Sequence, residues 1–212
     1  MLRLYLLAHA PTGAQRQYRF AADEGILPIS ATLIERVRER VGVCDAVLRG
    51  PERRAAETAA ALSMTATPCN ELSAWSTGSW SGRSLTWVAE HEPEAFHAWQ
   101  TDPNAAPGGG ETLNALLARV AQWADAQASI SGSVLVIADP AVIRGIVVHV
   151  LGAPPASFWR FDIAPLSLSV VQHAVGQWRL RCLGLDPSDP IHSAGPRLEQ
   201  SHTRDGAPGE VR

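Results

Sequence analysis

The chain has 212 residues, enough for one α/β domain with a tail but too few for two domains of common size. Hydrophobic residues make up 46% of the sequence and charged residues 18%, which supports a buried core and excludes a chain that is disordered throughout. The formal net charge of -3 argues against nucleic acid or an anionic membrane as partner. All 18 basic residues are arginine, so chemistry that needs a lysine is excluded.

The cysteines give an indication of the compartment. Cys44, Cys69 and Cys182 are far apart and form no C-x-x-C pair, so the sequence predicts neither a disulfide framework nor a zinc site. The first apolar run, residues 4–8, is too short for a signal segment or a membrane span. We therefore expect a soluble protein of the reducing cytoplasm.

In chain order, predicted strands alternate with predicted helices. Residues 2–7 and 134–138 have the apolar pattern of buried parallel strands, and residues 45–48 predict a shorter one. Apolar residues recur with helical period in five segments, namely residues 31–40, 52–62, 85–99, 112–128 and 141–151. Residues 168–174 and 178–183 predict a hairpin at a sheet edge. This order predicts a layered α/β fold around a mixed sheet.

The end of the chain has a different composition. From residue 186 onward it is rich in Pro, Gly, Ser and charged residues, with no apolar period. Such a composition is typical of a segment that does not pack. We predict one α/β domain over residues 1–185 and a flexible tail over residues 186–212.

Polar side chains follow two of the predicted strands. His9 comes just after the predicted strand at residues 2–7, and Asp139 directly after residues 134–138. The carboxyl ends of parallel strands form the edge at which open α/β sheets bind ligands, so both side chains are expected there. Arg53 and Arg54 lie in the first turn of a predicted helix, where backbone N–H groups favour anions. These residues predict an anion site at one edge of the sheet.

Five motifs in the same order resemble those of the histidine phosphatase superfamily, also called the phosphoglycerate mutase-like family. They are residues 8–15 (AHAPTGAQ) for R-H-G-x-T-x-x-N, 50–59 (GPERRAAETA) for S-P-x-x-R-A-x-x-T-A, 72–82 (LSAWSTGSWSG) for L-x-E-x-x-x-G-x-W-x-G, 107–112 (PGGGET) for P-G-G-E-S/T, and 134–144 (VLVIADPAVIR) for the strand leading to S/T-H-G-G-V-I-R. The resemblance extends over residues 2–183. The chain length and the short insert at residues 87–107 resemble the alpha-ribazole-phosphatase-like branch.

The resemblance implies a three-layer α/β/α sandwich with a mostly parallel mixed central sheet, and hydrolysis of phosphate monoesters through a phosphohistidine. His9 matches the nucleophile and Arg54 a phosphate-binding arginine. Thr12 and Gln15 match positions that contact the phosphate, and Glu111 is the family-matched carboxylate that we also expect near it. We expect no metal and no cofactor, with a small phosphorylated molecule or another anion as partner; the sequence carries no indication of the oligomeric state.

Three positions depart from the family pattern. Ala8 replaces the first phosphate-binding arginine, Ala74 the glutamate that protonates the leaving group, and Asp139 the second histidine. Loss of a general acid costs about 100- to 10,000-fold in rate. An ionised carboxylate near the phosphoryl group adds repulsion of about 4 kcal/mol at 4 Å and an effective dielectric of about 20. The sequence predicts a degenerate site, and leaves open a weak phosphatase or a non-catalytic protein that binds an anion or a protein partner.

Asp139 has two interpretations that can coexist. As N-cap with Pro140 at the first helical position, it is suited to begin the helix at residues 141–151. It can also take over the missing acid role, which requires a pKa raised by burial or by a neighbouring carboxylate. Glu111 is the carboxylate that the resemblance supplies for that coupling.

Other polar residues have alternatives too. Arg53 is expected on the solvated helix face, with Arg54 as the ligand contact. Either Arg16 or Arg19 can replace the missing arginine, although surface solvation is favoured for both. His91 and His97 lie among acidic residues, but their spacing does not match a zinc-binding helix, so a structural role is favoured.

Overall fold

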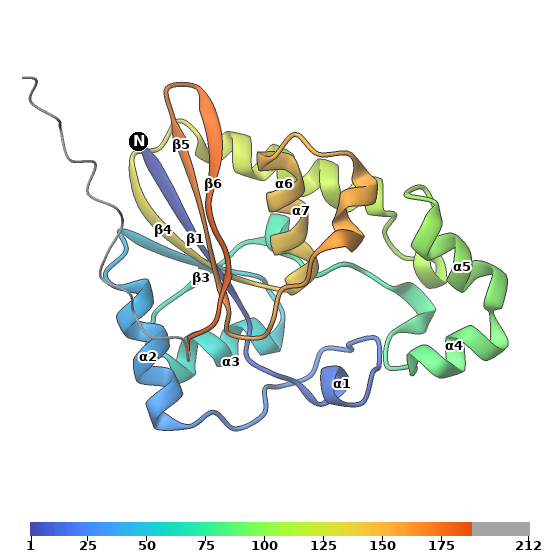
Figure 1. Cartoon of the computed structure of the whole chain (residues 1–212). Helices are drawn as coiled ribbons and strands as arrows, with labels where there is room; N and C mark the ends of the chain where they lie inside the picture. Colours follow the sequence, from blue (N-terminus) through green and yellow to red (C-terminus); the bar gives the residue numbers. More distant parts are fainter. Residues whose placement is uncertain (188–212) are drawn as a thin grey trace, which may run out of the picture.

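The structure, a computed structural model, describes residues 1–187; of the predicted tail at residues 186–212, residues 188–212 lie outside the described residues. One sheet has the strand order β3-β2-β4-β1-β5-β6 (Figure 1). Its strands are β1 (Leu2–Ala8), β2 (Ala46–Arg49), β3 (Thr67–Pro68), β4 (Gly132–Ala138), β5 (Leu168–Ala174) and β6 (Gln177–Leu185). Strand β3 was not predicted because two residues are too short to show an alternating pattern.

The sheet is mixed, as predicted. Strands β3, β2, β4 and β1 pair in parallel, whereas β5 is antiparallel to β1 and β6 is antiparallel to β5. The predicted hairpin is therefore confirmed, with β6 at the edge of the sheet. Its turn has Val175 at φ 52° and Gly176 at φ 71°, the left-handed conformations that a two-residue hairpin turn requires.

Seven α-helices are assigned within the described residues. They are α1 (Gly13–Arg16), α2 (Ala31–Val41), α3 (Arg53–Ala61), α4 (Leu85–His91), α5 (Pro93–Thr101), α6 (Leu113–Gln127) and α7 (Pro140–Val150). The prediction of a single helix over residues 85–99 is wrong, because Glu92 ends α4 and Pro93 begins α5. Proline has no N–H to continue a helix but is well suited to the first helical position.

Helices cover both faces of the sheet, which confirms the three-layer arrangement (Figure 1). Successive side chains of a strand point to opposite faces. Leu4 and Leu6 of β1 accordingly pack with buried residues of α6 and α7. Leu7 packs on the other side, with buried residues of α2 and α3. The alternating apolar residues of β1 thus join two cores.

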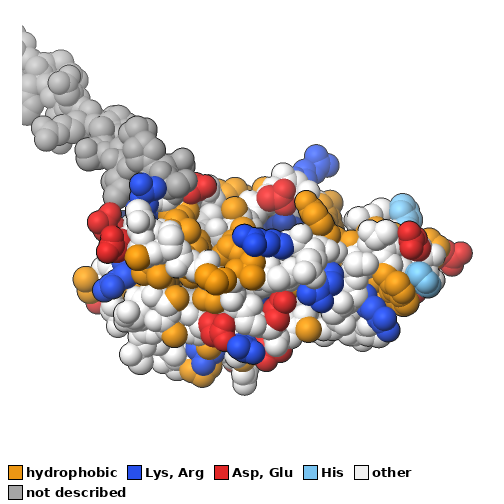
Figure 2. Space-filling view, turned by 90° about the horizontal axis from the view of Figure 1, so that it is seen from below, with side chains coloured by type: hydrophobic (Ala, Val, Ile, Leu, Met, Phe, Trp, Pro, Cys, Tyr) orange, Lys and Arg blue, Asp and Glu red, His pale blue; other side chains and the backbone are white. Residues whose placement is uncertain are grey.

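Helices α4 and α5 form a projection beside the sheet (Figure 1). A third buried cluster, Phe20, Trp80 and Val88, joins this projection to the rest of the domain. On the face seen in Figure 2, acidic and basic side chains are interspersed, in agreement with the small net charge, and histidines lie at the end formed by α4 and α5. No helix of the described part of the chain is long and apolar enough to cross a bilayer.

The register of the two central strands brings the chemistry-bearing residues together. Ala8 of β1 is paired with Ala138 of β4, and the backbone N–H of His9 donates to the carbonyl of Ala138 at 3.0 Å. The residues that follow the two strands, His9 and Asp139, therefore leave the sheet side by side.

Candidate active site

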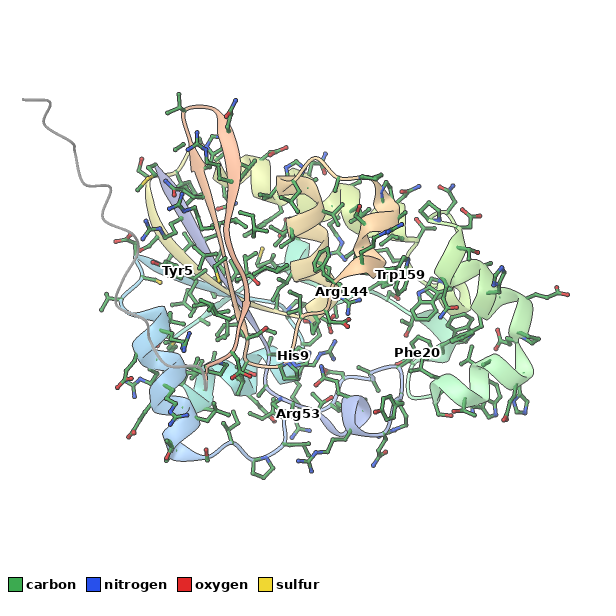
Figure 3. All side chains as sticks on the ribbon, in the orientation of Figure 1. Tyr5, His9, Phe20, Arg53, Arg144 and Trp159 are labelled. Carbon is green, nitrogen blue, oxygen red and sulfur yellow. The ribbon has the colours of Figure 1, made fainter. Side chains whose placement is uncertain are left out.

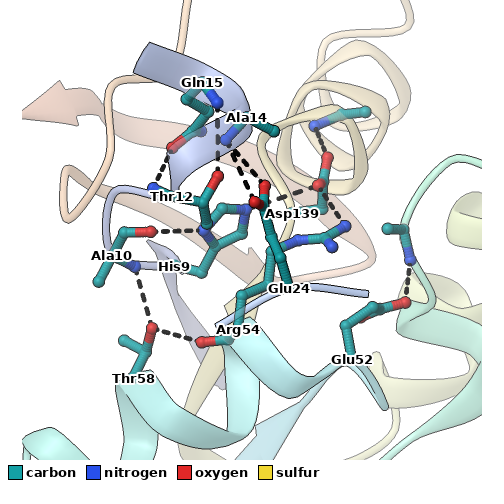
Figure 4. A network of polar contacts seen from close by, with 12 residues as sticks. His9, Ala10, Thr12, Ala14, Gln15, Glu24, Glu52, Arg54, Thr58 and Asp139 are labelled. Carbon is teal, nitrogen blue, oxygen red and sulfur yellow. Dashed lines mark hydrogen bonds and ion pairs between the residues drawn. The ribbon is translucent and has the colours of Figure 1, made fainter. Parts of the chain in front are cut away.

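His9 is held in one orientation at the end of β1. The side chain is 2% exposed, and its Nδ1 lies 2.7 Å from the carbonyl oxygen of Ala10 (Figure 4). Because a carbonyl oxygen only accepts, Nδ1 carries a proton and donates it to this hydrogen bond. The other ring nitrogen, Nε2, lies 3.5 Å from Oδ2 of Asp139. Nε2 is therefore the atom of the ring available for chemistry.

Thr58 of α3 fastens the segment that holds His9. Its hydroxyl accepts from the backbone N–H of Ala10 at 2.9 Å and donates to the carbonyl of Arg54 at 2.7 Å. Thr58 is fully buried, so these bonds form away from solvent. They tie the turn after β1 to the first turns of α3, which carries Arg54.

Thr12 and Gln15 bind each other in a capping box at α1. The Thr12 hydroxyl accepts from the backbone N–H of Gln15, and the Gln15 side-chain oxygen accepts from the backbone N–H of Thr12. Glu24 accepts from the backbone N–H of Ala14 in the same turn. Thr12 is buried, whereas Gln15 lines a cleft beside Asp139. Of this pair, only Gln15 is placed to contact a ligand directly.

Arg53 and Arg54 are separated as the sequence predicts. Arg53 is 63% exposed and pairs with Glu57 at 2.6 Å. Arg54 is 4% exposed; one terminal nitrogen donates to the carbonyl of Ala22 at 3.1 Å and the other to Asp139 Oδ2 at 3.0 Å. Arg54 is thus the buried cation next to His9 (Figure 4).

Asp139 begins α7, which confirms the N-cap interpretation. Its Oδ1 accepts from the backbone N–H of Ala141 at 2.9 Å, and Pro140 takes the first helical position. Burial by itself raises the pKa of Asp139, but the adjacent His9 ring and the charge of Arg54 outweigh it, so the pKa is below its usual value. The expectation of a raised pKa is wrong, and the carboxylate is ionised at neutral pH.

Glu111 pairs with Arg119 and not with Asp139. Both of its carboxylate oxygens accept from the guanidinium of Arg119, at 2.8 and 2.9 Å. Its carbonyl accepts from the indole N–H of Trp75 at 2.7 Å. The structure therefore gives Glu111 a bridging role between Arg119 and Trp75, and it does not couple Glu111 to the titration of Asp139.

A cleft of about 290 Å³ opens beside Asp139, and we call it the Asp139 cleft. Its polar lining consists of Gln15, Arg19, Thr77, Arg54, Asp139 and Arg144, and its aromatic lining of Phe20, Trp75, Trp99, Phe158 and Trp159. Figure 3 shows Arg144, Trp159 and Phe20 on the side of the domain that faces α4 and α5. His9 does not line the cleft, so Asp139 stands between its Nε2 and a ligand.

Several residues that line the cleft have a buried side-chain donor without a hydrogen-bond partner. Among the buried side-chain atoms of residues 1–187, these include Nε of Arg19, Arg54 and Arg144 and Nε1 of Trp99. All four residues line the Asp139 cleft. Buried donors are costly unless bonded. The guanidinium groups of Arg19, Arg54 and Arg144 also give the lining positive charge, which suits an anion.

Arg16 and Arg19 occupy different positions. Arg16 is exposed, as predicted, whereas Arg19 lines the cleft, which agrees with the alternative prediction for this residue. No local pattern separates these two arginines.

Sequence reasoning missed two further features. Trp75, Trp99 and Trp159 are dispersed along the chain but pack together, with ring centroids 5.0 to 5.9 Å apart. Glu52, the N-cap residue of α3, accepts through Oε1 from the backbone N–H of Ala74 at 2.6 Å. The only signal for Glu52 was a glutamate at a helix start, where Ser, Thr, Asp or Asn is preferred.

The histidines of the projection are separate from this site. His91 stacks on Trp87 with a centroid distance of 4.4 Å, and its Nδ1 lies 2.8 Å from the Trp87 carbonyl oxygen. Over the described residues, no group of three or more His, Cys, Asp or Glu side chains is placed to hold a metal ion. The contacts of His91 are those of a structural residue.

The site therefore combines an imidazole that is fixed through one nitrogen with a buried guanidinium, at the sheet edge where α/β folds bind ligands. The family model described as Histidine phosphatase superfamily (branch 1) matches residues 4–186. The chain belongs to this superfamily.

Solved structures show the same fold at low sequence identity. The mycobacterial glucosyl-3-phosphoglycerate phosphatase aligns with a TM-score of 0.76 at 22% identity, covering 87% of this chain and 99% of that one. A putative alpha-ribazole-5'-P phosphatase of Escherichia coli K-12 aligns with a TM-score of 0.74 at 22% identity, covering 86% and 96%. A bifunctional protein of Mycobacterium tuberculosis H37Rv is 27% identical over 181 residues, 80% of this chain. The chain spans about half the length of this relative.

Proposed function

We propose that the protein hydrolyses small phosphate monoesters by transferring the phosphoryl group to Nε2 of His9. The observation that carries this proposal is the hydrogen bond from Nδ1 of His9 to the carbonyl of Ala10. This bond places the ring proton on Nδ1 and so leaves the Nε2 lone pair for attack on phosphorus.

Arginines surround the position that the phosphoryl group takes in this proposal. Arg54 reaches the side of Asp139 that faces His9, and Arg19 and Arg144 line the same cleft. Planar guanidinium groups suit phosphate oxygens because they donate two parallel hydrogen bonds. Arg19 is our candidate to perform the role of the phosphate-binding arginine that Ala8 replaces.

The aromatic lining supports a leaving group with an apolar or aromatic part. Trp75, Trp99 and Trp159 present ring surface to the Asp139 cleft, and such walls favour apolar ligand surface. The names of the solved relatives specify alpha-ribazole phosphate, glucosyl-3-phosphoglycerate and, for an Entamoeba histolytica protein, phosphoserine. These substrates differ from one another. The relatives therefore support phosphatase chemistry but do not indicate which substrate binds, and we base that part of the proposal on the lining of the cleft.

We further propose that turnover is slow because of Asp139. Its ionised carboxylate lies 3.5 Å from Nε2 of His9, where a phosphate dianion must approach. Repulsion between two charges about 4 Å apart is about 4 kcal/mol at an effective dielectric of about 20. A barrier increase of this size lowers the rate roughly a thousandfold.

The test is phosphate release from p-nitrophenyl phosphate and a panel of metabolite phosphates by wild type and His9→Ala. We expect wild type to exceed His9→Ala by at least about tenfold, since the substitution removes the nucleophile. His91→Ala, the same substitution at an exposed histidine, is the matched control and should retain wild-type activity. Equal rates for wild type and His9→Ala would overturn the proposal.

A second candidate function is binding of an anion without turnover. The contact of Asp139 with both His9 and Arg54 favours it, because the carboxylate already takes the place of an anion between them. In this case orthophosphate or vanadate raises the melting temperature of wild type by mass action, and Arg54→Ala removes the shift. Wild type then shows no His9-dependent phosphate release. The cytoplasmic location stays a prediction in either case.

A further inference from the structure

We propose that Glu52 is the general acid of this site and takes the place of the glutamate absent at Ala74. The inference rests on the proposed phosphatase activity. It concerns the leaving group, whereas the proposed function concerns the nucleophile, so the two can be tested apart.

The carboxylate of Glu52 reaches the backbone of the altered position itself. Its Oε1 accepts from the N–H of Ala74 at 2.6 Å (Figure 4). Glu52 comes from the start of α3, two residues before Arg54, so it belongs to the element that also supplies the phosphate-binding arginine. A carboxylate is thus delivered to the position of Ala74 from another segment of the chain.

Glu52 does not serve the usual purpose of a residue at its position. It is the N-cap of α3, yet its side chain makes no capping hydrogen bond. The cap site is served by Asp23, whose Oδ1 accepts from the backbone N–H of Arg53 at 2.9 Å. The helix start is therefore satisfied without the Glu52 carboxylate, which leaves that group available for another role.

Gly50 makes room for this carboxylate. A Cβ at Gly50 would lie 2.5 Å from Glu52 Oε2 and 3.0 Å from the carbonyl oxygen of Leu72. The first position of this family motif is a serine, which the resemblance aligns with Gly50. A side chain at position 50 would therefore collide with the Glu52 carboxylate, and Gly50 leaves that space free.

The carboxylate faces open space next to the phosphate position. Glu52, Arg54 and Ala74 line a cavity of about 330 Å³, which we call the Glu52 cavity. It shares Arg54, Trp75 and Thr77 with the lining of the Asp139 cleft. A phosphate ester bound at Arg54 can thus point its leaving oxygen into the Glu52 cavity. Asp139 cannot supply the proton, because its carboxylate is ionised.

The proposed step balances as follows. Nε2 of His9 forms a bond to phosphorus as the bond between phosphorus and the ester oxygen breaks, and the proton of the Glu52 carboxyl moves to that oxygen, releasing an alcohol. The Glu52 carboxylate then takes a proton from the water that attacks the phosphohistidine. Orthophosphate leaves, and His9 and Glu52 return to the forms in which they began the cycle.

The test compares two esters that differ in how much they need an acid. p-Nitrophenyl phosphate has a leaving group that departs without a proton, whereas 2-phenylethyl phosphate releases an alkoxide that requires one. For Glu52→Gln, which keeps the size of the side chain and an acceptor for the Ala74 N–H, we expect kcat/KM to fall at least about 100-fold on the alkyl ester. On p-nitrophenyl phosphate we expect a change below about threefold.

Two further variants show whether Glu52 acts as a general acid or only as a structural residue. Asp23→Asn removes a second carboxylate that lines the Glu52 cavity, and should change the rates on both esters by the same factor. Adding Ala74→Glu to Glu52→Gln should restore turnover of the alkyl ester at least tenfold. Equal losses on both esters, or no loss on the alkyl ester, would overturn the role of Glu52 while leaving the phosphatase intact. Absence of His9-dependent turnover of p-nitrophenyl phosphate by wild type would instead overturn the proposed function, and this inference with it.

Discussion

The two sides of the site are built differently. On the nucleophile side, which we define as His9, Ala10, Arg54 and Thr58, side chains are almost fully buried and backbone groups are joined by direct hydrogen bonds. On the opposite side, Ala74 takes the position of the missing acid. Its backbone N–H donates to the carboxylate of Glu52, the N-cap residue of α3. Asp139, which lies between the two sides, is 18% exposed; its Oδ2 lies 3.5 Å from Nε2 of His9 and 3.0 Å from a terminal nitrogen of Arg54.

This difference indicates which parts of the site tolerate change. The nucleophile side is part of the core, because Thr58 links the turn after β1 to α3 and Arg54 is enclosed among their residues. Substitutions there alter packing and buried hydrogen bonds. The opposite side lines cavities, so its side chains can be exchanged at a smaller cost in folding.

The largest expected effect comes from Asp139→His. It removes the carboxylate next to His9 and restores the residue of the family motif, so we expect kcat/KM on p-nitrophenyl phosphate to rise about 100- to 1000-fold. Asp139→Asn, which removes the charge but keeps the shape, should give about a tenfold increase, because its side chain still fills the space. Asp162→Asn, at the highly exposed partner of Arg144, is the control and should change the rate less than about threefold. An unchanged or lower rate in Asp139→His would mean that this carboxylate assists the reaction.

The next largest effect is a difference in unfolding free energy between variants of two neighbouring arginines, Arg54 and Arg53. Arg54→Ala leaves the Asp139 carboxylate without its buried cation, so we expect the free energy of unfolding to fall by about 3 kcal/mol. Arg53→Ala removes an exposed ion pair with Glu57, and the expected change is within about 0.5 kcal/mol. Urea unfolding at pH 7 measures both. Similar losses in the two variants would show that the nucleophile side is no more tightly built than the helix surface.

The smallest expected effect concerns the hydroxyl of Thr58. Thr58→Val keeps the shape of the side chain but leaves the buried N–H of Ala10 without an acceptor, which costs about 1–3 kcal/mol in unfolding free energy. Thr58→Ser keeps the hydroxyl and should retain the hydrogen bond, with a loss of about 1 kcal/mol from the missing methyl group. Urea unfolding measures both, and Thr58→Val is expected to be the less stable of the two variants. Equal stability of Thr58→Val and wild type would contradict the role of Thr58 in fastening the His9 turn.

Much of the fold could be predicted because it depends on short-range patterns. The apolar run of β4 and the hairpin of β5 and β6 are visible in the order of residues, and Pro140 after Asp139 marks the start of α7. The placement of His9 and Asp139 follows from the same patterns, since residues at the ends of neighbouring parallel strands meet at one edge.

Other features of the site could not be predicted from any local pattern. Glu111 was expected to couple to Asp139 but forms an ion pair with Arg119 of α6. The helical period places Arg119 on a face of α6 but does not show which charged side chain lies opposite that face. The gathering of Trp75, Trp99 and Trp159 joins segments up to 84 positions apart in the numbering. Such contacts depend on how loops pass over the sheet edge.

The amino-acid order alone therefore determined the layered sheet, the exposed position of Arg53 and the meeting of His9 with Asp139, because strand alternation and helical period are properties of neighbouring residues. Only the tertiary structure decided that Asp139 is ionised and that Glu52 lies against Ala74. The charge state of a carboxyl depends on the balance between burial and the charges around it, and those charges come from segments that only folding brings together.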